Sequence, residues 1–173
     1  MVLGRYDRAL DFVRLDPGSE WARVLTRVIY QRMGRRDDAR RQHEEVTPEY
    51  LRGMAPESIH GLLTRCLAGA APDRQGRLSA DDVTTFLTVR EDPEPLYFWA
   101  SDLVYCGYPA PAFTLLRESV RRNYCAVSAI EIDPAFAAIR GRPEYSELLG
   151  AARACRSRFR EHVSASQNTI QVR

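Results

Sequence analysis

The chain has 173 residues, 45% of them hydrophobic and 28% charged, with a formal net charge of +2. This length suits one domain that buries about two-thirds of its unfolded surface, and the small net charge argues against duplex nucleic acid as a partner. All 25 Lys-plus-Arg positions are Arg, which excludes Schiff-base lysine chemistry and a Walker-type phosphate site.

The first third of the chain is predicted to form three helices. Apolar residues recur at helical spacing over residues 4–14 and again over 21–33, and we expect Asp16-Pro17 to cap the second of these helices. Gly34 follows the last apolar position and is expected to end that helix in a left-handed conformation. A highly charged helix with a narrow apolar face is predicted over 36–45.

The middle of the chain is predicted to hold a short helix that begins at Thr47-Pro48 and a buried helix over 59–70. Residues 71–78 are expected to form a loop. Ser79 and Asp82 have the spacing of a capping box, which predicts that a further helix starts here. This helix carries the apolar residues Val83, Phe86 and Leu87.

In the last part of the chain, the cap-plus-proline signal at Asp92-Pro93 predicts a helix that ends before Gly107, and a second helix follows over 109–124. Residues 125–132 are interpreted as irregular. Asp133-Pro134 is expected to cap a short helix that ends near Gly141. A final helix is predicted from Pro143 to Val163.

No period-2 alternation competes with these helices, so the chain is predicted to be all-α. We expect a single helical domain over residues 1–163 and a polar, frayed tail over 164–173.

Three bends share one spacing, in which Ala follows Gly by five positions. They are Gly4 with Ala9, Gly34 with Ala39, and Gly107 with Ala112. Paired helices with such a bend resemble the tetratricopeptide repeat (TPR), whose unit is about 34 residues. The resemblance implies antiparallel helix pairs that stack as a short TPR-like α-solenoid, with Ala39 and Ala112 buried at tight helix crossings.

Other positions depart from the repeat pattern. Arg27 stands where a small residue is favoured, Arg23 stands where a large aromatic residue is favoured, and residues 46–95 contain no clean repeat. Gly76 could be the bend of one degenerate pair in that span.

Residues 133–149 resemble the closing segment of the repeat regions in large bacterial regulators that carry a kinase, cyclase or DNA-binding module. The chain also begins inside a repeat, at its second helix. We therefore expect it to be a fragment of such a protein.

The four cysteines are widely spaced and contain no C-x-x-C pair, so we expect buried free thiols and neither a zinc site nor a redox motif. A disulfide between Cys106 and Cys125 is excluded, because these residues sit at opposite ends of a predicted hairpin, roughly 20 Å apart. Neither a signal peptide nor a membrane helix is recognised, and a cytoplasmic location is the expectation.

No constellation of catalytic or metal-binding residues is recognised. The three histidines, His43, His60 and His162, are isolated and are expected to be packing or surface residues. The arginines of residues 32–41 alternate with acidic residues, which favours an ion-paired, solvated helix face over a phosphate-binding site.

Residues 71–82 can be aligned with the loop of a calcium-binding helix-loop-helix motif. The residues at tolerable positions in this alignment are Asp73, Gln75, Gly76, Leu78, Ser79 and Asp82. Its first ligand position is Ala71, and its last is Asp82 in place of a bidentate Glu. A capped loop without bound metal is therefore favoured, and no cofactor is expected.

The sequence thus predicts a non-enzymatic scaffold that binds a peptide or a partner domain, as a regulatory or sensory part of a larger bacterial signalling protein. By the TPR resemblance, the first helix of each pair lines the concave groove. The predicted groove residues are Trp21, Val24, Val28, Gln31, Glu94, Tyr97, Ser101 and Tyr105. An equally weighted interpretation places Trp21 and Val24 in the core.

Two alternatives remain open. One is a self-association module that forms a homo-oligomer, and the other is an α-helical enzyme or small-ligand binder with an unrecognised pocket. Neither a nucleic acid nor a membrane is expected as a partner.

Overall fold

The computed structural model describes residues 3–71, 79–89 and 92–171, with the backbone alone at 80, 83, 86, 88–89 and 165–171. Over these residues the chain is all-helical and contains no strand. The helices are α1 (Tyr6–Val13), α2 (Glu20–Arg32), α3 (Arg36–Glu44), α4 (Pro48–Met54), α5 (Glu57–Leu67), α6 (Ala80–Val89), α7 (Pro93–Tyr105), α8 (Pro109–Arg121), α9 (Val127–Ile132), the 3₁₀ helix η1 (Pro134–Ile139) and α10 (Pro143–Gln171).

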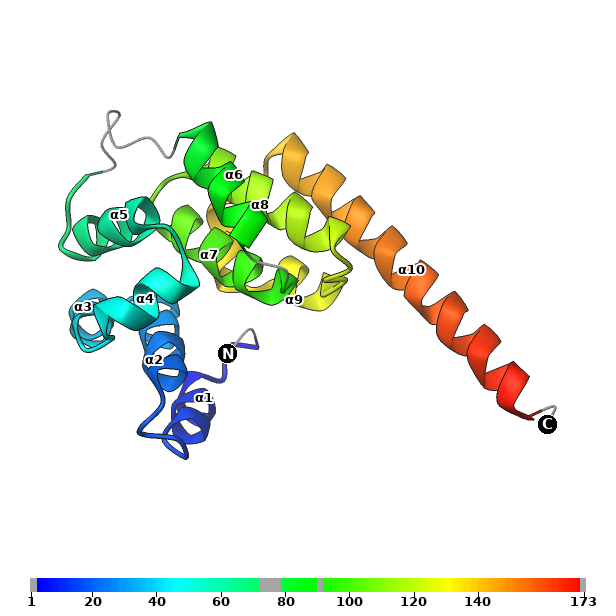
Figure 1. Cartoon of the computed structure of the whole chain (residues 1–173), viewed down its shortest axis with the longest axis horizontal. Helices are drawn as coiled ribbons and strands as arrows, with labels where there is room; N and C mark the ends of the chain where they lie inside the picture. Colours follow the sequence, from blue (N-terminus) through cyan, green and yellow to red (C-terminus); the bar gives the residue numbers. More distant parts are fainter. Residues whose placement is uncertain (1–2, 72–78, 90–91, 172–173) are drawn as a thin grey trace.

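The hairpin of α7 and α8 forms the centre of the molecule (Figure 1). Helix α10 packs along α8, while η1 packs on α7. The hairpin of α2 and α3 lies to one side and reaches the centre through α5, which packs on α3. Beyond the body, the C-terminal part of α10 extends away from the other helices (Figure 1).

The bends at Gly34 and Gly107 have the same geometry. Each glycine has a positive φ, +72° and +83° respectively, which is the left-handed conformation that closes a helix. In both, the residue after the glycine donates its backbone N–H to a carbonyl in the last turn, from Arg35 to Tyr30 at 2.9 Å and from Tyr108 to Leu103 at 2.8 Å. The predicted helical hairpins are therefore present.

Ala39 and Ala112 are both fully buried, with 0% of each residue exposed. A small side chain at these positions lets the second helix of each hairpin approach the neighbouring helices closely. The prediction that both alanines are buried is confirmed.

The helix starts follow the expected capping chemistry, with one difference. The Asp92 carboxylate accepts the N–H of Glu94 at 2.9 Å, and Ser79 and Asp82 bond reciprocally as a capping box. At the start of α2, however, the cap is Ser19, whose hydroxyl accepts the N–H of Ala22, and Asp16-Pro17 forms the preceding turn. Ser19 displaces Asp16 as the cap because it directly precedes the first helical residue.

Three further elements differ from the sequence-based expectation. The stretch interpreted as irregular contains the helix α9, and the segment after Asp133 is a 3₁₀ helix. Gly76, named above as the bend of a degenerate pair, lies outside the described part of the chain. Helix α10 continues through Gln171, across most of the predicted tail.

One cluster of buried apolar residues runs from Ala39 in α3 to Cys155 in α10. Tyr97 of α7 lies near its middle, in ring contact with Phe98, Tyr124 and Phe136. Most of α2 packs outside this cluster, so its attachment to α7 depends on longer side chains.

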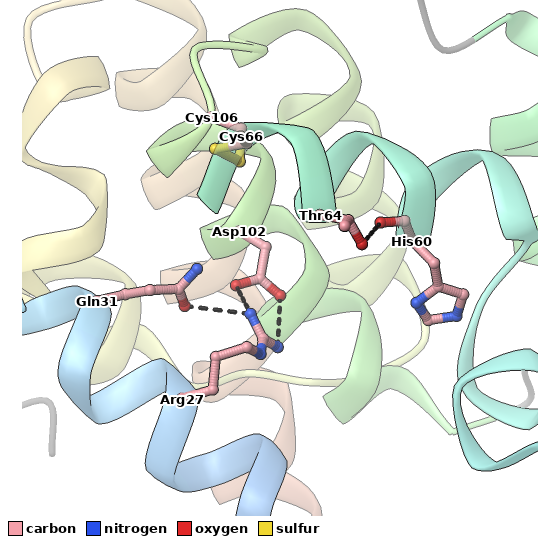
Figure 2. Close-up of a disulfide and its surroundings, with 7 residues drawn as sticks. All are labelled: Arg27, Gln31, His60, Thr64, Cys66, Asp102 and Cys106. Atoms are coloured by element: carbon pink, nitrogen blue, oxygen red, sulfur yellow. Dashed lines mark hydrogen bonds and ion pairs between the residues drawn. A yellow bond between two sulfur atoms is a disulfide. The ribbon is translucent and has the colours of Figure 1, made fainter. Parts of the chain in front are cut away.

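The expectation of free thiols is wrong. Cys66 pairs with Cys106, which joins the end of α5 to the end of α7 (Figure 2), and Cys125 pairs with Cys155, which joins the turn after α8 to α10. The Cα atoms are 5.6 Å and 5.4 Å apart, which is the ordinary range for a disulfide. The pairing follows from helix packing, which brings together cysteines that are far apart in the sequence.

Among the described residues, none of the helices has both the length and the apolar character needed to cross a bilayer. The proposed calcium ligands Asp73, Gln75, Gly76 and Leu78 and the side chains of Val83 and Phe86 lie outside the described part of the chain.

Candidate functional site

Two buried ion pairs attach α2 to the rest of the molecule. The first joins Arg27 of α2 to Asp102 of α7, with Nη1–Oδ1 at 2.6 Å and Nη2–Oδ2 at 3.0 Å (Figure 2). Nη1 of Arg27 also donates to Oε1 of Gln31 at 3.2 Å, one helical turn further along α2. A two-pronged bond of this kind fixes both distance and orientation, so it sets how α2 lies against α7.

The second pair is centred on Asp133, the residue that precedes η1. Arg32 of α2 donates from Nε to Oδ1 at 2.8 Å and from Nη2 to Oδ2 at 2.5 Å. The hydroxyl of Tyr97 also donates to Oδ2, and the backbone N–H of Ala135 donates to Oδ1 at 3.0 Å. Asp133 is 0% exposed and thus joins α2, α7 and η1 at one point.

The protonation states of this cluster follow from its contacts. Burial alone would raise the pKa of Asp133, but the hydrogen bonds and charge of Arg32 outweigh this effect and hold the pKa below its usual range. Burial alone would lower the pKa of Arg32, but the hydrogen bond to Asp133 and its charge outweigh burial, so the pKa of Arg32 is raised. Burial raises the pKa of Tyr97 strongly, with Asp133 adding to the effect. The cluster is therefore a stable ion pair with a neutral tyrosine.

A pocket of about 270 Å³ opens where these three elements meet. Helix α2 contributes Gln31 and Arg32 to its wall. Helix α7 contributes Ser101, Val104 and Tyr105. The remaining wall is η1, with Pro134, Ala135, Ala137 and Ala138. The pocket combines a small apolar surface with a few polar groups, which is the usual composition of a ligand site.

Three of the predicted groove residues, Gln31, Ser101 and Tyr105, line this pocket together. The other five lie elsewhere. Val24, Val28 and Tyr97 are buried, so these side chains are not available to a partner. Trp21 is half-buried and packs edge-on against Phe98 at 5.6 Å between ring centroids, and Glu94 is exposed at the start of α7.

The histidines of the core are held neutral. Nε2 of His43 bonds Oγ1 of Thr64 at 2.9 Å, and Nε2 of His60 bonds the carbonyl of Leu51. Burial, and then the charge of Arg27, lowers the pKa of His43 to about 4, and burial also lowers the pKa of His60. Within the described residues, no group of three or more His, Cys, Asp or Glu side chains is arranged to hold a metal ion.

The hydroxyl of Ser101 donates to the carbonyl of Phe98 at 2.7 Å, which leaves its hydrogen committed to the backbone. The Ser101 oxygen keeps its capacity to accept a hydrogen bond, so Ser101 contributes a polar group to the pocket wall.

Sequence reasoning missed Arg27, Asp102 and Asp133 as the residues that build this site. Arg27 was noted only as a departure from the repeat pattern, and Asp133 only as a helix cap. An Arg on the apolar face of a predicted helix is the signal that could have been used, because a buried Arg requires a buried acid elsewhere.

Comparisons with protein-family models, curated proteins and solved structures found no match for this chain.

Proposed function

We propose that the protein is a non-enzymatic binding scaffold that takes a peptide or a segment of a partner protein in the pocket between α2, α7 and η1. The observation that carries the proposal is the pocket itself, in which Gln31, Ser101 and Tyr105 meet. These residues come from the first helices of two Gly-bend hairpins, which are the helices that line the concave face in TPR-like arrays. The TPR-like stacking, and a place in a larger bacterial signalling protein, are part of this proposal.

The rigidity of the site supports this role. Two buried, two-pronged Arg–Asp pairs hold the three walls of the pocket together, so the pocket is preformed and little ordering is required on binding. A volume of about 270 Å³ is near the lower end for ligand sites, and it suits one amino-acid side chain better than a large cofactor.

Selection of peptides from a random display library, followed by hydrogen exchange, tests the proposal. Bound peptide should protect backbone amides in the C-terminal half of α2, in α7 and in η1. Protection confined to other elements would contradict it.

Self-association is the second candidate, because apolar side chains are exposed at both ends of the molecule. On α1 and the turn after it, Phe12 is 73% and Leu15 is 79% exposed, and on α10 Phe159 is 64% exposed. Sedimentation at high concentration tests this function: a dimer that Phe159→Ser dissociates would support it, and a monomer would remove it.

The disulfides bear on the compartment in which the protein works. Disulfides persist in oxidising compartments and are rare in cytosolic proteins. The two disulfides therefore favour an oxidising compartment over the predicted cytoplasm. Alkylation of free thiols during cell lysis decides the point. Four labelled cysteines would support the cytoplasm, and unlabelled cysteines would support an oxidising compartment.

A further inference from the structure

The amide of Gln31 has an unused donor in the wall of the pocket. Gln31 is only 7% exposed, and its Oε1 accepts a hydrogen bond from Arg27. This bond fixes the orientation of the amide, with Nε2 turned away from the guanidinium (Figure 2). Within the described part of the chain, Nε2 is buried and has no hydrogen-bond partner. A buried donor without a partner is unfavourable, so a ligand that supplies an acceptor gains binding free energy from this contact.

Several acceptors around the pocket, in contrast, are occupied. Both oxygens of Asp133 accept from two donors each, and Oε1 of Gln31 is bonded to Arg27. Arg32, which also lines the pocket, already donates to Asp133 and to the carbonyl of Val28. Among the described residues that line the pocket, the buried side-chain atom without a hydrogen-bond partner is Nε2 of Gln31.

Apart from Arg32, Ser101 and Tyr105, the rest of the wall is apolar and small. Val104, Pro134, Ala135 and Ala138 offer methyl and methylene groups beside the Gln31 amide. The pocket therefore matches a group in which a carbonyl or carboxylate oxygen stands next to a short aliphatic side chain.

We infer that the pocket binds an acylated aliphatic residue of a peptide, whose carbonyl or carboxylate oxygen accepts a hydrogen bond from Nε2 of Gln31. This inference rests on the proposed function and adds the chemical class of the bound residue. The oxygen has two sources, a backbone carbonyl within a peptide or the carboxylate at its end.

Three small probes separate these possibilities in a titration of ¹⁵N-labelled protein followed by amide chemical shifts. N-acetyl-leucinamide offers neutral carbonyls, N-acetyl-leucine adds a terminal carboxylate, and isopentylamine has a similar alkyl group with a donor alone. We expect saturable shifts at Gln31, Ser101 and Tyr105 with one or both acetylated probes and none with the amine. A stronger response to N-acetyl-leucine assigns the carboxylate, and an equal response assigns the backbone carbonyl.

Variants of Gln31 test the contact itself. Gln31→Met removes the donor, and Gln31→Glu keeps an acceptor for Arg27 but replaces the donor with a negative charge. Each should weaken binding of the acetylated probes by about 2- to 10-fold or more, the effect of one hydrogen bond. The matched control Gln42→Met on α3 should bind as the wild type does. The amide spectrum shows whether each variant is folded, and either variant suffices if the other is not.

Equal binding of isopentylamine, or unchanged binding by a folded Gln31 variant, would overturn the inference. If library-selected peptides still protect α2, α7 and η1 in that case, the proposed function stands and only the acceptor chemistry is wrong. If no peptide protects these elements, the proposed function fails as well.

Discussion

Asp133 is the residue on which the contacts between α2, α7 and η1 converge. Its carboxylate binds Arg32 and Tyr97 and caps η1 through Ala135. Its backbone carbonyl also accepts from Nη2 of Arg140 at 2.9 Å. Because every one of these partners belongs to a wall of the pocket or to its support, a change at Asp133 affects the whole site.

Asp133→Asn should therefore be strongly destabilising. The substitution leaves the guanidinium of Arg32 buried without a counter-charge, which costs about 3–5 kcal/mol in the free energy of unfolding. Urea unfolding measures this loss. The matched control is Asp11→Asn, because the pair of Asp11 with Arg14 is about 70% exposed on both sides and should contribute almost nothing. Equal losses in the two variants would contradict the assignment of Asp133 as a central tie.

The lowered pKa of His43 makes the stability of the protein depend on pH in mild acid. Its pKa is about 4 in the folded protein and 6.5 in the unfolded chain, so only the unfolded chain takes up a proton between these values. The contribution of neutral His43 is complete above pH 6.5 and is lost as the pH falls towards 4. Asp102 opposes this shift, while Arg27 and His60 reinforce it.

From the shift, His43 should account for about 1–3 kcal/mol of stability lost between pH 7 and pH 4. Urea unfolding at a series of pH values measures the slope, and His43→Gln should flatten it. The carboxylates with lowered pKa lose their contribution at lower pH, as for Glu118 with a pKa of about 2. An unchanged slope above pH 4.5 in the variant would show that His43 is not buried in its neutral form.

Among the helices, α2 and α3 are joined into a hairpin by the bend at Gly34. Gly34→Ala should destabilise the protein by about 1 kcal/mol, because an L-residue is strained at a φ of +72° even though the space for a methyl group is open. Gly150→Ala is the matched control. Gly150 lies within α10 with open space around it, so Ala there should stabilise by about 0.5–1 kcal/mol. Thermal unfolding of both variants measures the difference, and effects of the same sign would contradict the assigned bend.

Most helices and both main bends could be predicted from the sequence, because their signals are local. Gly34 and Gly107 each end a helix through their own left-handed backbone conformation. Asp92 caps a helix by accepting the N–H of Glu94, two residues further along the chain. The disulfides and the Arg27–Asp102 pair could not be predicted in this way. Their partners are separated by 30 to 75 positions, and only the tertiary packing of separate helices, such as that of α10 along α8, brings such residues together.

The candidate site shows the same division. Gln31, Ser101 and Tyr105 could be named through the resemblance to the TPR, in which the first helix of each pair lines the concave face. Val24 and Val28 were assigned to that face too, but they are buried, because the remainder of α2 packs inward. The short helix after Asp133 was expected, but its contribution to the pocket was missed, because the sequence does not show that η1 packs on α7.

For the whole molecule, the proposed binding face is the surface between α2, α7 and η1. The C-terminal part of α10 extends away from the other helices, so a function located there would leave the pocket unused (Figure 1). The two faces can be separated by substitutions at exposed alanines, which alter the surface without disturbing the core.

The most direct measurement compares Ala138→Arg, on the pocket wall in η1, with Ala151→Arg, on the exposed side of α10. Fluorescence anisotropy gives the affinity of a labelled, library-selected peptide for each variant. We predict that Ala138→Arg weakens binding at least tenfold, about 1.4 kcal/mol, whereas Ala151→Arg binds as the wild type does. Unchanged binding by Ala138→Arg, or a loss caused by Ala151→Arg alone, would contradict the account.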